Sequence, residues 1–419
     1  MGAISESQWD DMLARGYLGD ERVGQFGIER SMEDLLHGTA GYRVYEVDAA
    51  NRPIRLIEEV EPINGFDVQL TIDLDLQRYV EEMLETTLLA RRQVDVGNPM
   101  VMNDATKRME RLDPTQGETV RHKAPAGSAV VMNSENGQVA ALASYPTFDN
   151  RWFEAGLSRS KFQQVFPVTD DPDLSILVNR AVQGRYNLGS TFKPFTAMAA
   201  LNTGLIGVDT RFDDEGTYRL SDDAMDADKC DSGLFKCIFK NATCGNGRPC
   251  VYGPVDVEDA LAVSSDTFFY NIGDQIFVQN NGQPILQEQL EQFAFGADTG
   301  IELPFEFDGT VPDAELKRYY AEKGIISELE GRKYYVGDNV QVAIGQGLLS
   351  ATPIQLADSY AAIANGGTLL QPTLIKAVWN PGVPDAAEAG YADLSQATQY
   401  LGDGYDTAGE AHVIRELDI

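Results

Sequence analysis

Hydrophobic and polar residues alternate over short distances in two parts of the chain, and each pattern predicts strands. Val68, Leu70 and Ile72 fall at every second position, which is typical of a strand with one buried face. Ala129–Met132 and Val139–Ser144 are β-prone runs separated by the segment NSENGQ. Because an Asn-Gly pair favours the turn of a two-stranded hairpin, we expect these two runs to pair.

A helical pattern follows the first of these strands. Six apolar residues recur at spacings of three and four, which places them on one face of a helix. Asp73 or Asp75 precedes them and is a suitable N-terminal cap. Residues 92–122 are polar and charged without periodicity, so we expect a surface insertion there. The apolar positions are Leu76, Tyr79, Val80, Met83, Leu84 and Leu88.

The two ends of the chain differ in pattern. The first 60 or so residues mix short acidic helical segments with stretches interrupted by glycine, which predicts an irregular, partly extended module. From about residue 175 the pattern is largely helical, with alanine, serine and threonine at close-packing positions. A hairpin followed by a helical block predicts a mixed α/β fold.

Composition narrows the possible functions. The 419 residues are 43% apolar, enough for two or three domains with buried cores. A net charge of −32 repels phosphate backbones and anionic lipids, which argues against nucleic-acid binding and polybasic membrane docking. No apolar run is long enough to span a bilayer, and the first residues do not form a signal peptide. The three histidines, His37, His122 and His412, are not at metal-ligand spacing.

The strongest chemical candidate is Ser190, in the segment RYNLGSTFKPFTAMAAL. Apolar residues recur after it on one helical face, and Pro194 is best tolerated near a helix start. A helix beginning at about Ser190 places Lys193 on the same face. Burial and the helix N-terminus both favour a neutral amine, which can accept the proton of a serine hydroxyl. The pair is therefore a candidate nucleophile and general base.

The same spacing also fits a purely structural role. Ser190 is equally suited to cap the helix, with Lys193 in solvent one turn on. Ser158 and Lys161 repeat the spacing in a polar segment that lacks the preceding glycine and the apolar face. Ser-x-x-Lys by itself is therefore weak evidence for catalysis.

Two further segments add to this candidate. Ser264, Ser265 and Asp266 follow an apolar helical run and precede an aromatic block, so they either line a cleft or cap a helix. The segment QVAIGQGLLSATPIQLADSYAAIANGG carries Gly-Gln-Gly at residues 345–347 and a Thr-Pro pair at 352–353. By itself this segment predicts a loop, a capped helix and a glycine-terminated end.

Taken together and in this order, these segments resemble the transpeptidase domain of class B penicillin-binding proteins. The elongation-type subgroup, the penicillin-binding protein 2 family, is the most similar, since its second motif often ends in Asp. The resemblance covers most of residues 16–376 and implies a penicillin-binding-protein/serine β-lactamase-like α/β (α+β) fold, with a helical block against an antiparallel sheet. The segments that carry the resemblance are GSTFKPFTA, SSD, IGQG with LLSATPIQLADSYAAIANGG, and, upstream, GFDVQLTIDLDLQ, GSAVVMNSENGQVAALASYPTFD, NRAVQGRYNLGS and the pedestal-like VGQFGIERSMEDLLHGTAG.

The resemblance implies a role for each matching residue. Ser190 matches the acylated nucleophile, Lys193 its general base, and Ser264 the second-motif serine that relays protons. Asp266 stands where other class B members have asparagine. A carboxylate lacks the amide donor, so holding a substrate carbonyl would require Asp266 to be protonated or to act through water.

The activity implied is D,D-transpeptidation of peptidoglycan in cell-wall elongation and cell shape. Ser190 would attack the carbonyl between the two terminal D-alanines of a donor stem peptide, and an amine of a second stem peptide would capture the acyl-enzyme. β-Lactams mimic the D-Ala-D-Ala bond and would acylate the same serine. The resemblance implies no cofactor. It implies a glycosyltransferase and other elongation proteins as partners, and the extracytoplasmic face of the bacterial cell membrane as the location.

The sequence also departs from the family. The third motif, Lys-Thr-Gly or Lys-Ser-Gly, does not occur; in the family it lies downstream of the segment similar to TLLQPTLIKAV. We therefore expect a chain truncated at both ends, lacking the membrane anchor, part of the pedestal and the third-motif strand. Loss of one oxyanion-hole donor costs about 100- to 1,000-fold in rate, so the chain alone is expected to be slow or inert toward penicillin. Residues 377–419 are acidic and poor in β-branched residues, and we expect a tail rather than a long strand.

The domains implied are part of a pedestal at residues 1–65 and an incomplete transpeptidase domain at residues 66–419, with insertions near 92–122 and 221–252. Two other functions stay open. One is a non-catalytic elongation scaffold with a degenerate transpeptidase fold. The other is a serine β-lactamase or β-lactam sensor, which does not account for the pedestal-like segment.

Four cysteines lie within 21 residues, between the first and second motifs. Because a class B enzyme works outside the cytoplasm, where disulfides persist, two bridges are the first interpretation, and three pairings are possible. A Cys₄ zinc site is the second, because no Cys-x-x-Cys pair occurs. The residues are Cys230, Cys237, Cys244 and Cys250.

Overall fold

The computed structural model describes residues 2–3, 8–19, 21–95, 100–103, 108–111, 120–153, 158–165, 175–221, 236–244, 248–379 and 413–417. The chain divides into two compact units. The first comprises residues 1–182, 300–306 and 372–412, and the second comprises residues 183–299, 307–371 and 413–419.

Short elements form the start of the first unit. Strand β1 (Gly2–Ala3) pairs with β2 (Arg22–Val23). Three helices of four to six residues accompany them: α1 (Trp9–Ala14), α2 (Gly27–Ser31) and α3 (Glu33–Leu36). Met12, Tyr17 and Val23 form one small apolar cluster, and Met32 and Leu35 join Ile375 and Val378 in another. The short elements themselves agree with the glycine-interrupted sequence.

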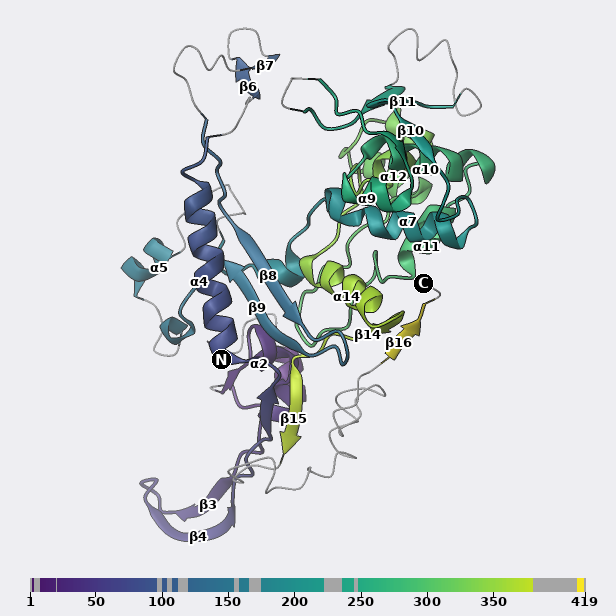
Figure 1. Ribbon diagram of the computed structural model, residues 1–419. Coiled ribbons are helices and arrows are strands. Elements are labelled where there is room, and N and C mark those ends of the chain that lie inside the picture. The colour runs from purple at the N-terminus through teal and green to yellow at the C-terminus, as the bar shows by residue number, and fades with distance from the viewer. Residues whose placement is uncertain are drawn as a thin grey trace. The chain divides into compact units, whose positions relative to one another are not determined.

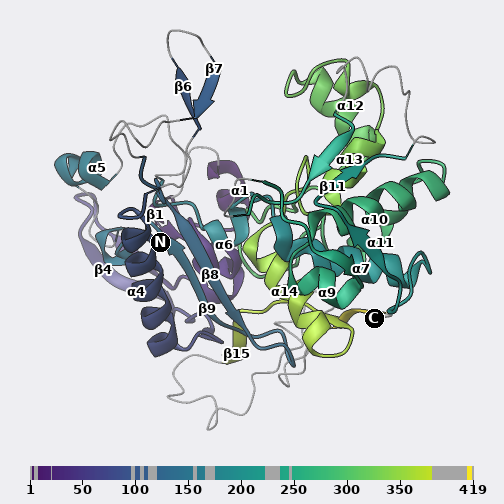
Figure 2. The same ribbon diagram turned by 45° about the horizontal axis from the view of Figure 1, so that its top comes forward.

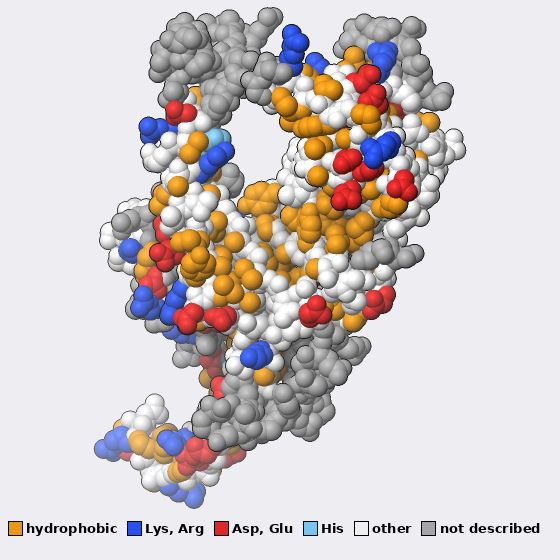
Figure 3. Space-filling view, viewed as in Figure 1, with side chains coloured by type: hydrophobic (Ala, Val, Ile, Leu, Met, Phe, Trp, Pro, Cys, Tyr) orange, Lys and Arg blue, Asp and Glu red, His pale blue; other side chains and the backbone are white. Residues whose placement is uncertain are grey.

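A long exposed hairpin follows these helices. Strand β3 (Tyr42–Val47) pairs antiparallel with β4 (Pro53–Val60), and every residue of both strands is exposed. Arg43 pairs with Glu59, and Arg55 pairs with Glu46, across the two strands. Basic, acidic and hydrophobic side chains therefore lie side by side on this hairpin (Figure 3), and its few positive charges are neutralised locally.

The strand and helix predicted near residue 70 are confirmed. Strand β5 (Asp67–Leu70) pairs antiparallel with β15 (Ile375–Trp379), which is more than 300 residues away in sequence. Helix α4 (Leu74–Arg91) begins directly after Asp73, whose side chain accepts hydrogen bonds from the backbone N–H groups of Asp75 and Leu76. Of the two caps considered, Asp73 is therefore the one used.

The predicted hairpin is also present. Strand β8 (Gly127–Met132) pairs antiparallel with β9 (Val139–Tyr145), and Gly137 in the turn has φ of +72°, a conformation that favours glycine. Helix α4 lies along this hairpin (Figure 1). The Gln77 amide fastens it there, donating to the Leu142 carbonyl at 3.0 Å and accepting from the Leu142 N–H at 2.7 Å.

The region predicted as a featureless insertion, residues 92–122, contains a second hairpin. Strand β6 (Met100–Asn103) pairs antiparallel with β7 (Arg108–Arg111). Its strands are rich in charged and methionine residues, so they carry no apolar alternation that would reveal them. Farther along the chain lie η2 (Asn150–Phe153), α5 (Arg159–Val165) and α6 (Arg180–Gln183).

The second unit is mainly helical, and its strands pair in short antiparallel ladders. The ladders are β10 (Phe212–Asp214) with β13 (Gly253–Val255), β11 (Thr217–Arg219) with β12 (Ile238–Lys240), and β14 (Thr368–Leu370) with β16 (Val413–Glu416). The helices are η4 (Gly189–Phe192), α7 (Lys193–Asn202), α9 (Val257–Ala262), α10 (Asp266–Gln279), α11 (Ile285–Glu291), α12 (Ala314–Glu322), η6 (Glu330–Arg332), α13 (Val336–Val342) and α14 (Pro353–Ala364).

Helices α7, α10 and α13 enclose the apolar core of this unit, and Figure 2 shows them together with α11 and α12. Phenylalanines dominate it. Phe192 and Phe195 lie 5.1 and 5.0 Å from Phe295, ring centre to ring centre, in edge-to-face contact. Burying each such ring contributes about 1.5–3 kcal/mol, so the start of α7 is held rigidly by its own apolar face.

The C-terminal residues form more structure than the sequence predicts. Ile375–Trp379 is strand β15, and Val413–Glu416 is strand β16 on the edge of β14. Leu417 then packs against Ala294, Ala362 and Leu369. The sequence predicts that residues 377–419 are a tail and not a long strand; the described part of them includes only the end of β15 and the four-residue strand β16, which needs no more than the pair Val413-Ile414 and a neighbouring edge. Among the described residues, no helix has the length and apolar character needed to cross a membrane.

Candidate active site

Ser190 lies in a tight turn that leads into α7. The turn is the 3-10 helix η4, and the backbone N–H of Lys193 donates to the Ser190 carbonyl at its end. The α-helix proper begins at Lys193 and has Pro194 in its first turn. A helix start at about Ser190 was predicted; the structure differs in placing one 3-10 turn first. Ser190 is exposed, whereas Phe192 and Lys193 beside it are buried.

Lys193 points into the protein and not into solvent. Its side chain is 1% exposed. Its Nζ lies 2.6 Å from Asp266 Oδ1, 2.8 Å from the Ser264 carbonyl oxygen and 3.0 Å from Ser264 Oγ. The three donors of an ammonium group thus have three acceptors, all from the second motif. The alternative in which Lys193 is a solvated residue beside a helix cap is wrong.

Two opposing effects act on the Lys193 amine. Burial lowers its pKa from the ordinary lysine value, because a charged amine is costly away from water. The hydrogen bond and negative charge of Asp266, and the charge of Asp214, act in the opposite direction. The net shift is downward, which is the direction that lets an amine act as a base near neutral pH.

The second motif forms the junction between two helices. Helix α9 ends at Ala262 and α10 begins at Asp266. Ser264 sits between them with φ of +57°, a left-handed conformation that turns the chain sharply and is uncommon outside glycine. Ser265 caps α10, since its Oγ accepts from the Phe268 N–H at 3.1 Å.

The helix-cap interpretation of this segment is correct for Ser265, and the interpretation that the segment lines a cleft stays a prediction. Ser265 is the cap, while Ser264 and Asp266 on either side of it contact Lys193. Asp266 is the hydrogen-bond acceptor of the lysine. An asparagine at this position would offer the lysine an uncharged acceptor in place of a carboxylate.

The Gly-Gln-Gly segment braces the turn that carries Ser190. The Gly189 N–H donates to the Gly345 carbonyl at 2.9 Å. A Cβ atom at Gly345 would lie 2.7 Å from Gly189 N and from Phe192 Cβ, too close for any other residue. On the same side, the Asn187 amide donates to the carbonyls of Gly347 and Leu349, at 3.1 and 2.8 Å. The segment holds the backbone before Ser190 in place.

Helix α14 supports the same turn from another side. It begins with a capping box, in which Thr352 accepts from the Gln355 N–H and the Gln355 side chain accepts from the Thr352 N–H. From this helix, Tyr360 donates its hydroxyl hydrogen to the Thr191 carbonyl at 2.7 Å. Its ring packs edge-to-face on Phe195. Through Tyr360, the segment TPIQLADSYAAIANGG thus contacts the residue next to Ser190.

The competing Ser158 and Lys161 pair behaves as a simple helix cap. Ser158 Oγ accepts from the backbone N–H of Lys161 at 3.2 Å, at the start of α5. The Lys161 amine lies over the Trp152 ring, 4.4 Å from its centre. The side chains do not form the buried arrangement seen at Lys193.

Sequence reasoning missed Asp214 and Asn241. Asp214 is fully buried on β10 and accepts from Ser265 Oγ at 2.5 Å, and Asn241 donates to both of its carboxylate oxygens. Asp214 is the last residue of the three-residue strand β10, and Asn241 follows β12 directly. Neither position has a distinctive spacing from Ser190 or Ser264, so only the fold identifies them.

The cysteine cluster contains a disulfide. Cys244 and Cys250 are bonded, with Cα atoms 5.1 Å apart. Cys237 is also disulfide-bonded, and Cys230 lies outside the described residues. Among the residues that the structure describes, no group of three or more metal-ligating side chains converges. Pairing in the exported protein stays a prediction.

Known proteins resemble this chain in sequence. It is 31% identical over 363 residues to the peptidoglycan D,D-transpeptidase MrdA of Salmonella typhimurium, covering 87% of this chain and 46% of that protein. It is 32% identical over 373 residues to MrdA of Escherichia coli, covering 89% and 47%. The chain thus spans about half the length of the curated relatives it matches.

Solved structures of penicillin-binding proteins also resemble this chain. PBP2 of Pseudomonas aeruginosa, in complex with WCK 5153, superposes with a TM-score of 0.60 at 26% identity, covering 92% of this chain and 66% of that one. PBP2 of Helicobacter pylori gives a TM-score of 0.61 at 26% identity, covering 89% and 56%. The fold predicted from the motifs is therefore confirmed.

Family models locate the resemblance along the chain. One described as a penicillin-binding protein dimerisation domain matches residues 1–70. One described as the penicillin-binding protein transpeptidase domain matches residues 127–400, well over half of the chain and all four candidate site residues. The exact boundary predicted at residue 65 stays a prediction. By sequence, fold and the arrangement around Ser190, the chain belongs to the penicillin-binding protein transpeptidase family, with relatives of the PBP2 type.

Proposed function

We propose that this chain carries the catalytic site of a peptidoglycan D,D-transpeptidase. One observation supports this most strongly: Lys193 is buried, with Nζ within 3.0 Å of Ser264 Oγ and Asp266 Oδ1, one turn after the exposed Ser190. A buried lysine amine facing a second serine is the arrangement that proton transfer from a serine nucleophile requires. The names of the MrdA relatives support the same activity.

In the proposed reaction, Ser190 Oγ attacks the carbonyl carbon between the two terminal D-alanines of a donor stem peptide. Lys193 accepts the hydroxyl proton as the C–O bond forms. Ser264, hydrogen-bonded to Lys193, passes a proton to the departing D-alanine nitrogen as the C–N bond breaks. An amine of a second stem peptide then attacks the acyl-enzyme and releases Ser190. General base catalysis of this kind contributes about 10²- to 10⁴-fold in rate.

Asp266 has a supporting role in this scheme. It accepts a hydrogen bond from Lys193 Nζ at 2.6 Å, so it orients the amine and stabilises the ammonium group that forms during attack. It also raises the pKa of Lys193 and partly offsets burial. We infer that this balance keeps Lys193 able both to accept a proton and to return it.

We also propose the partners and location of the protein. A chain 28% identical to this one, with a TM-score of 0.64, is part of a solved structure of a peptidoglycan synthase complex that coordinates polymerisation and crosslinking. That likeness supports the proposal of a partner that polymerises peptidoglycan, namely a glycosyltransferase. The proposed location is the extracytoplasmic face of the cell membrane, in cell-wall elongation, and the names of the peptidoglycan D,D-transpeptidase relatives support it.

The test is a crosslinking assay with defined peptides. The full-length protein that contains this chain is incubated with a donor peptide ending in D-Ala-D-Ala and an amine acceptor, and mass spectrometry looks for the crosslinked product and free D-alanine. We expect one D-alanine released per crosslink, and no product from Ser190→Ala. Release of D-alanine without crosslinks would indicate a hydrolase. No reaction from a folded protein that also fails to react with penicillin would indicate a non-catalytic scaffold.

A further inference from the structure

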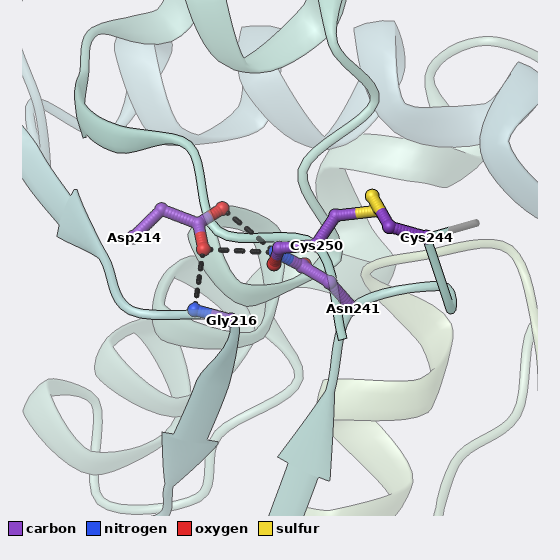
Figure 4. The surroundings of a disulfide bond; sticks show 5 residues. All are labelled: Asp214, Gly216, Asn241, Cys244 and Cys250. Carbon is purple, nitrogen blue, oxygen red and sulfur yellow. Dashed lines mark hydrogen bonds between the residues drawn. A yellow bond between two sulfur atoms is a disulfide. The ribbon is translucent and has the colours of Figure 1, made fainter. Parts of the chain in front are cut away.

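The Asn241 side chain connects the disulfide loop to the second motif. It is buried, and Figure 4 shows it facing Asp214 beside Cys250. Its Nδ2 donates to Asp214 Oδ1 and Oδ2, at 2.8 and 2.9 Å, and to the Cys250 carbonyl at 2.9 Å. Its Oδ1 accepts from the Thr267 N–H at 2.9 Å. The NH₂ group and the carbonyl oxygen of the amide therefore both take part in hydrogen bonds.

The partners of Asn241 hold the first turn of α10. Asp214 accepts from the Gly216 N–H at 2.8 Å and from Ser265 Oγ at 2.5 Å, and Ser265 caps the helix. Thr267 is bonded to Asn241 directly. Asp266, which contacts Lys193, lies between Ser265 and Thr267, so both of its neighbours are anchored to this buried pair.

The disulfide closes the loop that follows Asn241. Cys244 and Cys250 are bonded, the Cys250 N–H donates to the Ala242 carbonyl, and Thr243 and Pro249 form an antiparallel bridge. This places the Cys250 carbonyl on Asn241 Nδ2. The covalent bond restricts the conformations that the two ends of this loop can adopt.

We propose that the Cys244–Cys250 loop is a clamp for the second motif, in which Asn241 is a positioning residue that holds Ser264 and Asp266 against Lys193. The disulfide keeps Asn241 in place, and Asn241 with Asp214 sets the first turn of α10. Oxidation of the two cysteines is then coupled to assembly of the site. The geometric part stands by itself, and its effect on acylation rests on the proposed function.

Hydrogen exchange tests the geometric part. Two variants are compared with wild type, Asn241→Ala and the double variant Cys244→Ser with Cys250→Ser. Asn280→Ala is the matched control, because Asn280 bonds the Ile276 carbonyl at the opposite end of the same helix. We expect the Thr267 amide to exchange about tenfold faster in either variant, the effect of losing roughly one hydrogen bond, and to be unchanged in the control.

Combining the substitutions tests the clamp itself. If the disulfide acts through Asn241, the triple variant exchanges no faster than Asn241→Ala alone. Effects of the two changes that multiply would overturn the proposal, as would a Thr267 amide that exchanges normally in the disulfide variant. If Asn241→Ala does not fold, the disulfide variant still decides between these outcomes.

Penicillin acylation of the full-length protein that contains this chain, measured as a function of pH, gives the second readout. Attack needs a neutral Lys193, so the rate rises with pH through the pKa of that amine. The charged groups that face Lys193 are Asp266 and Asp214, and both raise this pKa. In Asn241→Ala we expect a lower maximal rate and an acid limb moved to lower pH, because Asp266 is no longer held at Nζ.

A merely destabilised protein would show a smaller labelled fraction with the same pH midpoint, and that result would overturn the positioning role. Wild-type protein that does not acylate at all would contradict the proposed function and leave the exchange results to judge the clamp.

Discussion

At the scale of single residues, the chemistry depends on how Lys193 is surrounded. A lysine in water is protonated at neutral pH and cannot act as a base. Here its side chain is 1% exposed, and burial lowers its pKa. Asp266 raises the pKa of Lys193, so burial and Asp266 together set the proton affinity of the amine. The position one turn after Ser190 makes this amine the proposed base for that hydroxyl.

Replacing Lys193 tests its role as base. In the full-length protein that contains this chain, Lys193→Ala should lower the rate of penicillin acylation by at least about 100-fold, because the proposed reaction uses this amine as its general base. Lys161→Ala is the matched control and should acylate at the wild-type rate. Time courses with a fluorescent penicillin measure both, and thermal melting verifies that each variant is folded. Acylation within a few-fold of wild type in folded Lys193→Ala would show that the lysine is dispensable.

Replacing Asp266 tests the balance of charges. Asp266 raises the pKa of Lys193, so Asp266→Asn removes that influence and lowers the pKa further. The neutral amine then persists to lower pH, and the acid limb of the acylation profile should move toward lower pH. Stopped-flow acylation between pH 5 and 9 measures it. A shift toward higher pH would contradict the assigned contact.

Sequence patterns could identify only part of this site. Ser190, Lys193, Ser264 and Asp266 belong to short motifs, and their order along the chain is distinctive. Asp214 and Asn241 could not be predicted, because each lies at the end of a three-residue strand with no motif around it. Their relation to Ser265 exists only after β10 and β12 have folded next to α10.

At the scale of elements, the site is a meeting of three segments that are far apart in sequence. The turn η4 supplies Ser190, the start of α10 supplies Asp266, and the segment after α13 braces them through Gly345. Gly345 has φ of +71° and lies against Gly189, which has φ of +57°. Two backbones approach closely here because neither carries a side chain.

Gly345→Ala should therefore damage the site more than strain alone explains. A Cβ atom would meet Gly189 and Phe192, so we expect the Ser190 turn to shift and acylation to fall by at least tenfold. Gly204→Ala is the matched control: its φ of +69° is similar, yet a Cβ there meets nothing within 4 Å. That control should lose only about 1–3 kcal/mol of stability.

Acylation rates and denaturant unfolding of the two glycine variants separate the two effects. Equal acylation by the two variants would contradict the bracing role of Gly345.

Elements with strong periodicity were predictable, and short ones were not. Helix α4 and the β8–β9 hairpin follow from apolar spacing and an Asn-Gly turn, since α4 half-buries Leu76, Val80, Leu84 and Leu88 and β9 buries alternate residues. Strand β16 escaped prediction because Val413 and Ile414 stand alone in an acidic segment. Their pairing depends on the free edge of β14, which a local pattern does not reveal.

At the scale of the whole molecule, the C-terminal residues add to the stability of the second unit. Leu417 packs against Ala294, Ala362 and Leu369, and its N–H donates to the Gly367 carbonyl at 2.7 Å. Leu417→Ala should lower the free energy of unfolding by about 1–2 kcal/mol. Ile414→Ala, at an exposed position on the same strand, is the control and should change it by less than about 0.5 kcal/mol. Chemical unfolding compares them, and equal losses would contradict the assigned packing.

The central claim is that Ser190 is the acylated nucleophile, and mapping the penicillin adduct tests it most directly. The full-length protein that contains this chain is treated with penicillin and digested, and mass spectrometry locates the added mass. The account predicts a single adduct on the peptide that contains Ser190, and none in Ser190→Ala, while Ser158→Ala labels like wild type. An adduct on another residue, or labelling that persists in Ser190→Ala, would contradict it.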